Sequence, residues 1–455
     1  MDTDGAGKTQ GSSAASKLGF WSIVLLGINS IIGPAIFLLP GKIYALDGTM
    51  SIVAVLFDMF LAMAIALCYA EASGMFKRDG GPYLYTKYSL GEFAGFEVGT
   101  VKWFIMSIVW GTNAVGFATA LGTVVPSLSD PTSISVVSTC LIIGMALLNI
   151  GGVSELKVLD NITTIGKLVP LALFILVGLF FMKGVNFQPL LPERVFSGNN
   201  FSAAAVLFFF AFTGFEALAI SAKDMKNPEK NLPGATIVSV LVISAVYLLS
   251  VCVCIGILGP RLAYQVAPLQ EAFHSSLGLI GKYFIVAGTL IATFGATLAA
   301  SFYSPRECIS IAEDGMLPKA LSKNSRFGTP ALAICCSAAI ASVVTWGGDF
   351  TRLATICAIA KFSEYIPTCL CIPIYRIKWA QKARAFKIPF GWLIPALAIV
   401  ASLWLITQSS WHEIAWGFSP LLIVLPLYFP YLIRKEEVRL ERRREEHRRC
   451  KKMKK

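Results

Sequence analysis

The chain has 455 residues, of which 55% are hydrophobic and only 15% are charged, and its mean hydropathy is +0.67. A soluble domain carries about 25% charged residues, so this composition excludes a soluble globular protein as well as a disordered, collagen-like or coiled-coil chain. The apolar stretches are continuous rather than alternating, which argues against a β-barrel and predicts an all-α protein that crosses the membrane several times.

The formal net charge of +12 is concentrated at the C-terminal end. The segment 434–455 contains twelve basic and five acidic residues and therefore carries +7 of the total. A basic segment that directly follows a membrane span is typical of contact with anionic lipid headgroups, and we expect that role for it rather than nucleic-acid binding. At the other end, residues 1–18 are rich in Gly, Ser, Ala and Thr, which predicts a disordered segment.

Residues 19–433 are expected to form one domain with twelve membrane spans. The connections on one side of these spans carry fifteen Lys and Arg residues, and those on the other side carry six. The positive-inside rule then places both termini in the cytoplasm and the domain in the cytoplasmic membrane. The expected spans are 19–46, 51–75, 91–126, 134–151, 158–183, 201–222, 232–258, 283–312, 330–347, 351–376, 389–410 and 414–433.

The first span is interrupted near its middle by Gly33 and Pro34. Pro34 has no N–H group and disfavours a helical conformation at Gly33. Asn29 and Ser30 place polar side chains beside the interruption. One interpretation is a kinked helix, which is common in membranes, and the other is unwound backbone that lines a binding cavity.

The sixth span favours the second interpretation. Thr213, Gly214 and Glu216 fall near mid-depth, where a charged carboxyl group costs at least about 2.5–3.5 kcal/mol unless it faces a cavity or a partner. The interrupted spans 1 and 6 are five apart, as are the long spans 3 and 8, which is typical of a five-plus-five inverted repeat followed by two further helices. Broken helices offer N–H groups to an anion and carbonyl groups to a cation, so an α-amino acid zwitterion suits this geometry.

Four motifs resemble, in the same order, those of the amino acid–polyamine–organocation superfamily. They are Gly27–Gly41 in span 1, Asp79–Tyr85 (Asp-Gly-Gly-Pro-Tyr-Leu-Tyr) in the first cytoplasmic loop, Asp224–Gly234 after span 6, and Arg306–Pro330 with its Glu-Asp-Gly-Met-Leu-Pro and Phe-Gly-Thr-Pro sequences. The resemblance covers spans 1 to 9. It implies the LeuT-like fold, alternating access, and transport of amino acids or close relatives.

The chain departs from the family pattern at Gly33-Pro34-Ala35, where Gly-Ser-Gly is usual. Pro34 offers neither a hydroxyl nor an N–H group to a substrate carboxylate. The carboxylate is therefore expected to be bound by Ala35, Ile36 and Ser30. Alternatively, the substrate is a polyamine or another organic cation without an α-carboxylate. The expected binding residues are Ser30, Ile31, Ile32, Gly33, Pro34, Ala35, Ile36, Phe210, Thr213, Gly214 and, from span 3, Asn113.

Two charged residues are candidates for ion coupling. Glu216 either takes up a proton during the cycle or hydrogen-bonds to backbone that the break frees. Lys167 lies in span 5, about one and a half to two turns from the cytoplasmic side, and either snorkels to the interface or donates to carbonyl groups around Ile31 and Ile32. The resemblance favours the second alternative, because sodium-independent members hold a lysine where sodium-coupled relatives hold an ion. It therefore implies sodium-independent transport, as proton symport or as exchange.

Other charged residues have plainer interpretations. Lys361 and Glu364 are three apart in span 10, which favours an ion pair within one helix. Lys102 is expected to pair or snorkel near a helix end. Glu71 and Arg306, near the cytoplasmic ends of spans 2 and 8, either form an ion pair at an inner gate or have a packing role. No cofactor, metal cluster or catalytic triad is predicted, since the three histidines all lie outside the expected spans. We therefore expect a carrier rather than an enzyme, and rather than a channel, because no filter loop repeats.

Overall fold

A computed structural model of the chain describes residues 18–76, 80–152, 156–189, 198–218, 225–381, 384 and 386–453. Within these ranges the regular structure is helical, and the only β pairing is an isolated bridge between Leu18 and Met225. The prediction of an all-α fold is confirmed. The predicted disordered segment lies outside the described residues except for Leu18, as do Asp79 and Asp224 of two family-like motifs.

The first half of the chain supplies eight α-helices. They are α1 (Phe20–Ile31), α2 (Ala35–Leu38), α3 (Pro40–Asp47), α4 (Ser51–Ser73), α5 (Gly81–Leu90), α6 (Glu92–Gly122), α7 (Pro131–Ile150) and α8 (Leu156–Gly178). The local sequence explains where α7 begins. Pro131 opens α7, and the carboxylate of Asp130 accepts a hydrogen bond from Ser133 N at 2.8 Å, which caps the first turn.

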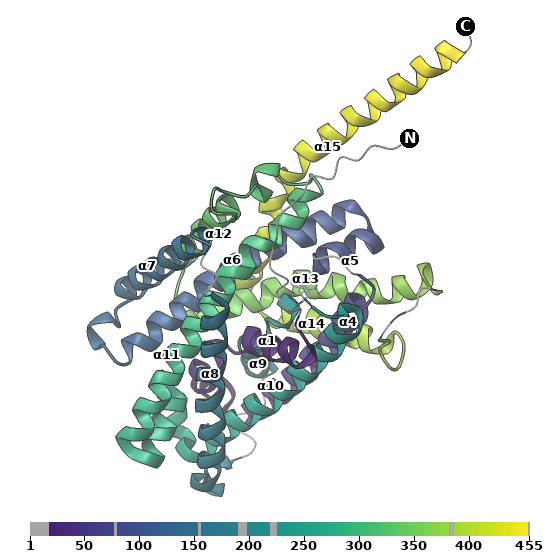
Figure 1. Cartoon of the computed structure of the whole chain (residues 1–455). Coiled ribbons are helices and arrows are strands. Elements are labelled where there is room, and N and C mark those ends of the chain that lie inside the picture. The colour runs from purple at the N-terminus through teal and green to yellow at the C-terminus, as the bar shows by residue number, and fades with distance from the viewer. Residues whose placement is uncertain are drawn as a thin grey trace.

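The second half of the chain supplies seven more α-helices. They are α9 (Gly198–Phe212), α10 (Pro228–Leu258), α11 (Pro268–Glu313), α12 (Ala331–Val344), α13 (Phe350–Lys378), α14 (Leu393–Gln408) and α15 (Trp411–Met453). Asp349 caps α13 by accepting from Arg352 N at 2.9 Å. The long α6 packs against α11, and α4 packs against α10; α7 and α12 lie together at one edge of the bundle (Figure 1).

Each of the twelve expected spans contains a helix. Among the described residues, nine helical stretches are long and apolar enough to cross a membrane, and three shorter apolar helices, α1, α12 and α14, accompany them. One of the nine, Pro40–Ser73, joins the last seven residues of expected span 1 to span 2. The protein is therefore a multi-pass membrane protein, and the number of crossings stays a prediction.

The structure differs from the expected elements at three places. The motif expected as a loop forms α5 from Gly81 onward, because Pro82 at a first-turn position is compatible with a helix. Helix α11 begins at Pro268, well before the expected start at 283, and Gly278 with φ 66° separates its two parts. Helix α15 does not end with the last span but continues to Met453 and projects from the bundle (Figure 1).

Candidate functional site

The expected break in span 1 is present between α1 and α2. The backbone leaves the helix at Ile32, whose φ and ψ are −70° and 107°, and Pro34 at −64° and −24° starts the next helical segment. The side chain of Ser30 donates to Leu26 O at 2.8 Å within its own helix. The break exposes carbonyl groups at the end of α1, which then need donors from elsewhere in the bundle.

Lys167 of α8 supplies these donors. Its Nζ atom lies 2.6 Å from Asn29 O and 2.9 Å from Ile32 O, and the residue is fully buried. Ile31 O, one of the expected acceptors, instead accepts from Tyr247 Oη at 3.3 Å. Lys167 lies eleven residues, or about 16 Å, along α8 from the first residue of that helix. Its side chain reaches into the bundle and does not snorkel.

The expected break in span 6 follows α9. Helix α9 ends at Phe212, Thr213 and Gly214 form a turn, and a 3₁₀ segment occupies 215–218. Gly214 has φ 118°, and a Cβ atom built on it would lie 2.3 Å from Ser30 O. The two breaks therefore meet backbone to backbone at a position that only glycine fits.

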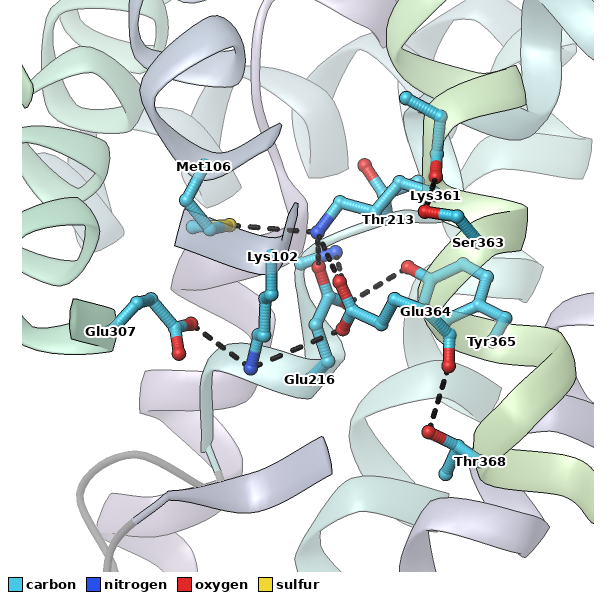
Figure 2. A network of polar contacts seen from close by, with 12 residues as sticks. Lys102, Met106, Thr213, Glu216, Glu307, Lys361, Ser363, Glu364, Tyr365 and Thr368 are labelled. Carbon is cyan, nitrogen blue, oxygen red and sulfur yellow. Dashed lines mark hydrogen bonds and ion pairs between the residues drawn. The ribbon is translucent and has the colours of Figure 1, made fainter. Parts of the chain in front are cut away.

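Glu216 is buried at this second break and accepts from three groups. Its Oε2 atom accepts from Gly214 N at 2.9 Å and from Tyr365 Oη at 3.0 Å, while Oε1 accepts from Lys361 Nζ (Figure 2). The expected pair of Lys361 with Glu364 in the same helix is present at 3.5 Å, yet Lys361 reaches across to Glu216 as well. The sequence interpretation of Lys361 was therefore incomplete.

A cavity of about 40 Å³ lies between the two breaks. This volume holds a few water molecules, so a substrate enters only if the walls move. Ile32 and Ile36, both expected binding residues, do not line it; their side chains are buried in the hydrophobic core. The expected residues that line it are Ser30, Ile31, Gly33, Pro34, Ala35, Asn113, Phe210, Thr213, Gly214 and Glu216.

Sequence reasoning missed the charged residues that extend from the cavity. Lys102 was expected near a helix end, but it is buried within α6, 2.9 Å from Glu307 of α11 and 3.9 Å from Glu364 of α13. Tyr69 of α4 donates to Glu364 at 2.8 Å. The available signal was the occurrence of Lys102, Glu307 and the Lys361–Glu364 pair inside apolar spans, where unpaired charges are costly.

The expected pair between Glu71 and Arg306 is wrong. The buried Glu71 carboxylate accepts from Arg376 Nη2 at 2.6 Å, from Arg384 Nη1 at 3.1 Å and from Ile388 N at 2.9 Å. The guanidinium group of Arg306 instead lies 3.4 Å from the centre of the Phe302 ring. Two arginines and a backbone N–H group satisfy the carboxylate more completely than Arg306 alone would.

Comparison with known proteins gives the same picture over most of the chain. The amino acid permease family model matches residues 18–427. An uncharacterized transporter of Mycobacterium tuberculosis is 30% identical over 431 residues, which cover 88% of this chain and 89% of that protein. The branched-chain amino acid permease BcaP of Bacillus subtilis is 28% identical over 440 residues, covering 92% and 93%. The serine/threonine exchanger SteT of Bacillus subtilis is 29% identical over 440 residues, covering 92% and 98%.

These matches confirm the family resemblance and the carrier prediction, since the family and the relatives are permeases and transporters rather than enzymes. They also fit a helical bundle whose first and sixth spans are both interrupted beside one cavity. The chain belongs to the amino acid permease family of the amino acid–polyamine–organocation superfamily.

Proposed function

We propose that this permease carries an uncharged α-amino acid by alternating access, without sodium. The observation that carries the proposal is the contact of Lys167 Nζ with Asn29 O and Ile32 O. These carbonyl groups at the end of a half-helix suit a cation, and a fixed ammonium group there excludes Na⁺ by charge repulsion. The proposed coupling is proton symport or amino acid exchange.

The cavity favours a zwitterion over a polyamine. Among the described residues that line the cavity, Glu216 is the only one with a carboxylate, and Lys361 already neutralises it. No described lining residue therefore offers an uncompensated negative charge to the several ammonium groups of a polyamine. The N-terminal end of the helical segment that starts at Ala35 provides N–H groups for a carboxylate.

The remaining walls of the cavity are mostly apolar and favour an uncharged substrate side chain. They include Val109, Ala296 and Ala300, and Phe210 at one end lies edge-on to Phe350 with 6.1 Å between ring centres. The names of two relatives point to branched-chain amino acids and to serine and threonine, which are all uncharged. We use L-leucine and L-serine as probes for that reason.

We further propose that both termini are cytoplasmic and that the basic C-terminal segment contacts anionic lipid headgroups. The distribution of Lys and Arg among the connections supports this orientation. Helix α15 supports the lipid contact, because it continues directly from the last span into the basic segment.

Counterflow in proteoliposomes tests the proposal. Purified protein is reconstituted, the vesicles are loaded with unlabelled substrate, and uptake of radiolabelled L-leucine, L-serine or putrescine is followed in sodium and in choline buffer. We expect saturable, stereoselective counterflow of an amino acid at the same rate in both buffers. A steep dependence on external Na⁺, uptake of putrescine alone, or non-saturable flux of a channel would each contradict the proposal.

A further inference from the structure

Five buried charged side chains form a continuous chain of contacts that starts at the cavity. Glu216 contacts Lys361, Lys361 lies 3.5 Å from Glu364, Glu364 lies 3.9 Å from Lys102, and Lys102 lies 2.9 Å from Glu307. They come from the segment after α9, from α13, from α6 and from α11, and Figure 2 shows the alternation of acid and base. The side chains are at most 4% exposed.

The cluster contains three carboxyl groups and two ammonium groups. If all five were ionised, the cluster would hold one uncompensated negative charge inside the membrane-spanning bundle. Such a charge is strongly unfavourable in a medium of low polarity, and the usual remedy is to bind a proton. The cluster therefore has a place for one proton, and the contacts of each carboxyl group indicate where it is held.

Glu216 and Glu364 each accept a hydrogen bond from a tyrosine hydroxyl group and also face a lysine. Glu216 accepts from Lys361, Tyr365 Oη and Gly214 N. Glu364 Oε1 accepts from Tyr69 Oη at 2.8 Å, and both lysines lie within 4 Å of its carboxylate, although its Oε2 atom has no hydrogen-bond partner among the described residues. Each of the two carboxyl groups therefore has a neutral hydrogen-bond donor as well as an ammonium group beside it.

Glu307 is the least well supplied. The ionisable groups that face it are Lys102 of α6 at 2.9 Å and, beyond Lys102, Glu364 and Lys361 of α13. Although Lys102 and Glu307 are close, their geometry is not that of a hydrogen bond, and neither Lys102 Nζ nor Glu307 Oε1 has a hydrogen-bond partner among the described residues. The Glu307 side chain is only 4% exposed, so bulk solvent does little to stabilise a charge on it.

We propose that Glu307 is the proton-binding site that couples transport to a proton gradient. One proton binds to a carboxylate oxygen of Glu307 from one side of the membrane and leaves as a proton on the other side, with no other bond made or broken. When Glu307 is neutral, Lys102 is attracted to Glu364 alone, and Lys361 is left to pair with Glu216 at the cavity. When Glu307 is charged, Lys102 is shared, and Lys361 is drawn toward Glu364. The protonation state of Glu307 thus affects the substrate cavity through Lys102 and Lys361.

This inference rests on the proposed amino acid transport and selects symport over pure exchange. The experiment uses the full-length protein in liposomes that contain a trapped pH-sensitive dye, with whichever of L-leucine and L-serine gives counterflow. Inward substrate flux through the parent is expected to acidify the lumen, and an imposed gradient of one pH unit is expected to drive up to about tenfold accumulation. In Glu307→Gln we expect counterflow to persist while acidification and accumulation are lost.

Three further variants make the result specific. Glu313→Gln removes an exposed carboxyl group from the same helix and should behave as the parent. Glu307→Asp keeps a carboxyl group and should retain substrate-driven acidification. Lys102→Met removes the nearest positive charge, so the pH midpoint of accumulation should move upward by about one unit or more. This measurement tests the proposal even where Glu307→Gln folds poorly.

The possible contradictions are distinct. Equal acidification by the parent and Glu307→Gln would place the proton elsewhere, and so would an unchanged midpoint in Lys102→Met. Counterflow of the parent without any proton movement would show an exchanger and overturn the inference while leaving the proposed amino acid transport intact. Absence of amino acid counterflow in the parent would instead contradict the proposed function itself.

Discussion

The two breaks beside the cavity are satisfied by charges of opposite sign. At the break after α1, the ammonium group of Lys167 binds two backbone carbonyl groups. At the break after α9, the carboxylate of Glu216 binds the N–H group of Gly214. An interrupted helix has a partial negative charge at its C-terminal end and a partial positive charge where the next segment begins, so the sign of each partner follows from which end it meets.

The two partners differ in how they are held. Lys167 donates to two backbone carbonyl groups of the first break, whereas Glu216 also pairs with Lys361, which is itself connected to Glu364. A charge bound by backbone dipoles depends on the geometry of one break. A charge bound in a network depends on several helices. A single substitution of Lys167 is therefore expected to disrupt the first break. A single substitution in the network around Glu216 is expected to disturb the second break less.

The largest effect is expected from Lys167→Ala. It removes two hydrogen bonds from a charged donor, each worth roughly 1.5–3 kcal/mol, and leaves two buried carbonyl groups without that donor. We expect counterflow to fall by about a hundredfold or more. Lys167→Arg should also be poor, because the planar guanidinium group does not fit a space occupied by an ammonium group. The exposed Lys42→Ala is the control, and a fully active Lys167→Ala would show that the first break needs no cation.

Glu216→Gln is expected to have the next largest effect. It keeps the shape of the side chain but leaves Lys361 with Glu364 at 3.5 Å as its remaining acidic partner. Removal of one member of a buried ion pair costs about 3–5 kcal/mol, and we expect a reduction at the lower end of that range because Glu364 remains. Thermal unfolding in detergent measures the change. The double variant Glu216→Gln, Lys361→Met should recover part of the loss, and strictly additive losses would argue against a network.

Gly214→Ala tests whether the two breaks depend on each other. The new methyl group would lie 2.3 Å from Ser30 O at a residue with φ 118°, so it strains its own backbone and pushes on the first break. Strain of this kind costs of order 1–3 kcal/mol, and we expect counterflow to fall at least about tenfold. Gly144→Ala is the control, because Gly144 lies outside the cavity and no atom lies within 4 Å of the methyl group that the substitution adds. Similar behaviour of the two variants would mean that close backbone contact is unimportant.

Both helix breaks could be predicted from the sequence. The side chains that bind at these breaks, and the residues that pair with those side chains, could be predicted only in part. Pro34 and Gly214 mark the interruptions because one lacks an N–H group and the other permits a positive φ. The partner of Glu216 could not be predicted, since Lys361 has an acidic residue three positions away and lies 145 residues from Glu216. For the same reason Arg376 was missed as the partner of Glu71: sequence spacing identifies neighbours within a helix, whereas contacts between helices depend on how the bundle packs.

Pro34→Ser is expected to have the smallest effect and to sharpen the comparison at the first break. The backbone angles of Pro34, −64° and −24°, suit serine, so the new residue adds an N–H and a hydroxyl group at the start of the helical segment without strain. One charge-assisted hydrogen bond to a substrate carboxylate is worth roughly 1.5–3 kcal/mol. Part of this gain is offset because the proline ring packs against Gly116 and is lost in the variant. We therefore expect the affinity for the amino acid, measured by counterflow at varied substrate concentration, to stay equal or to rise by at most about tenfold. If affinity for every α-amino acid tested falls more than that while an amine is still carried, the carboxylate does not bind at this break, and the first break serves Lys167 alone.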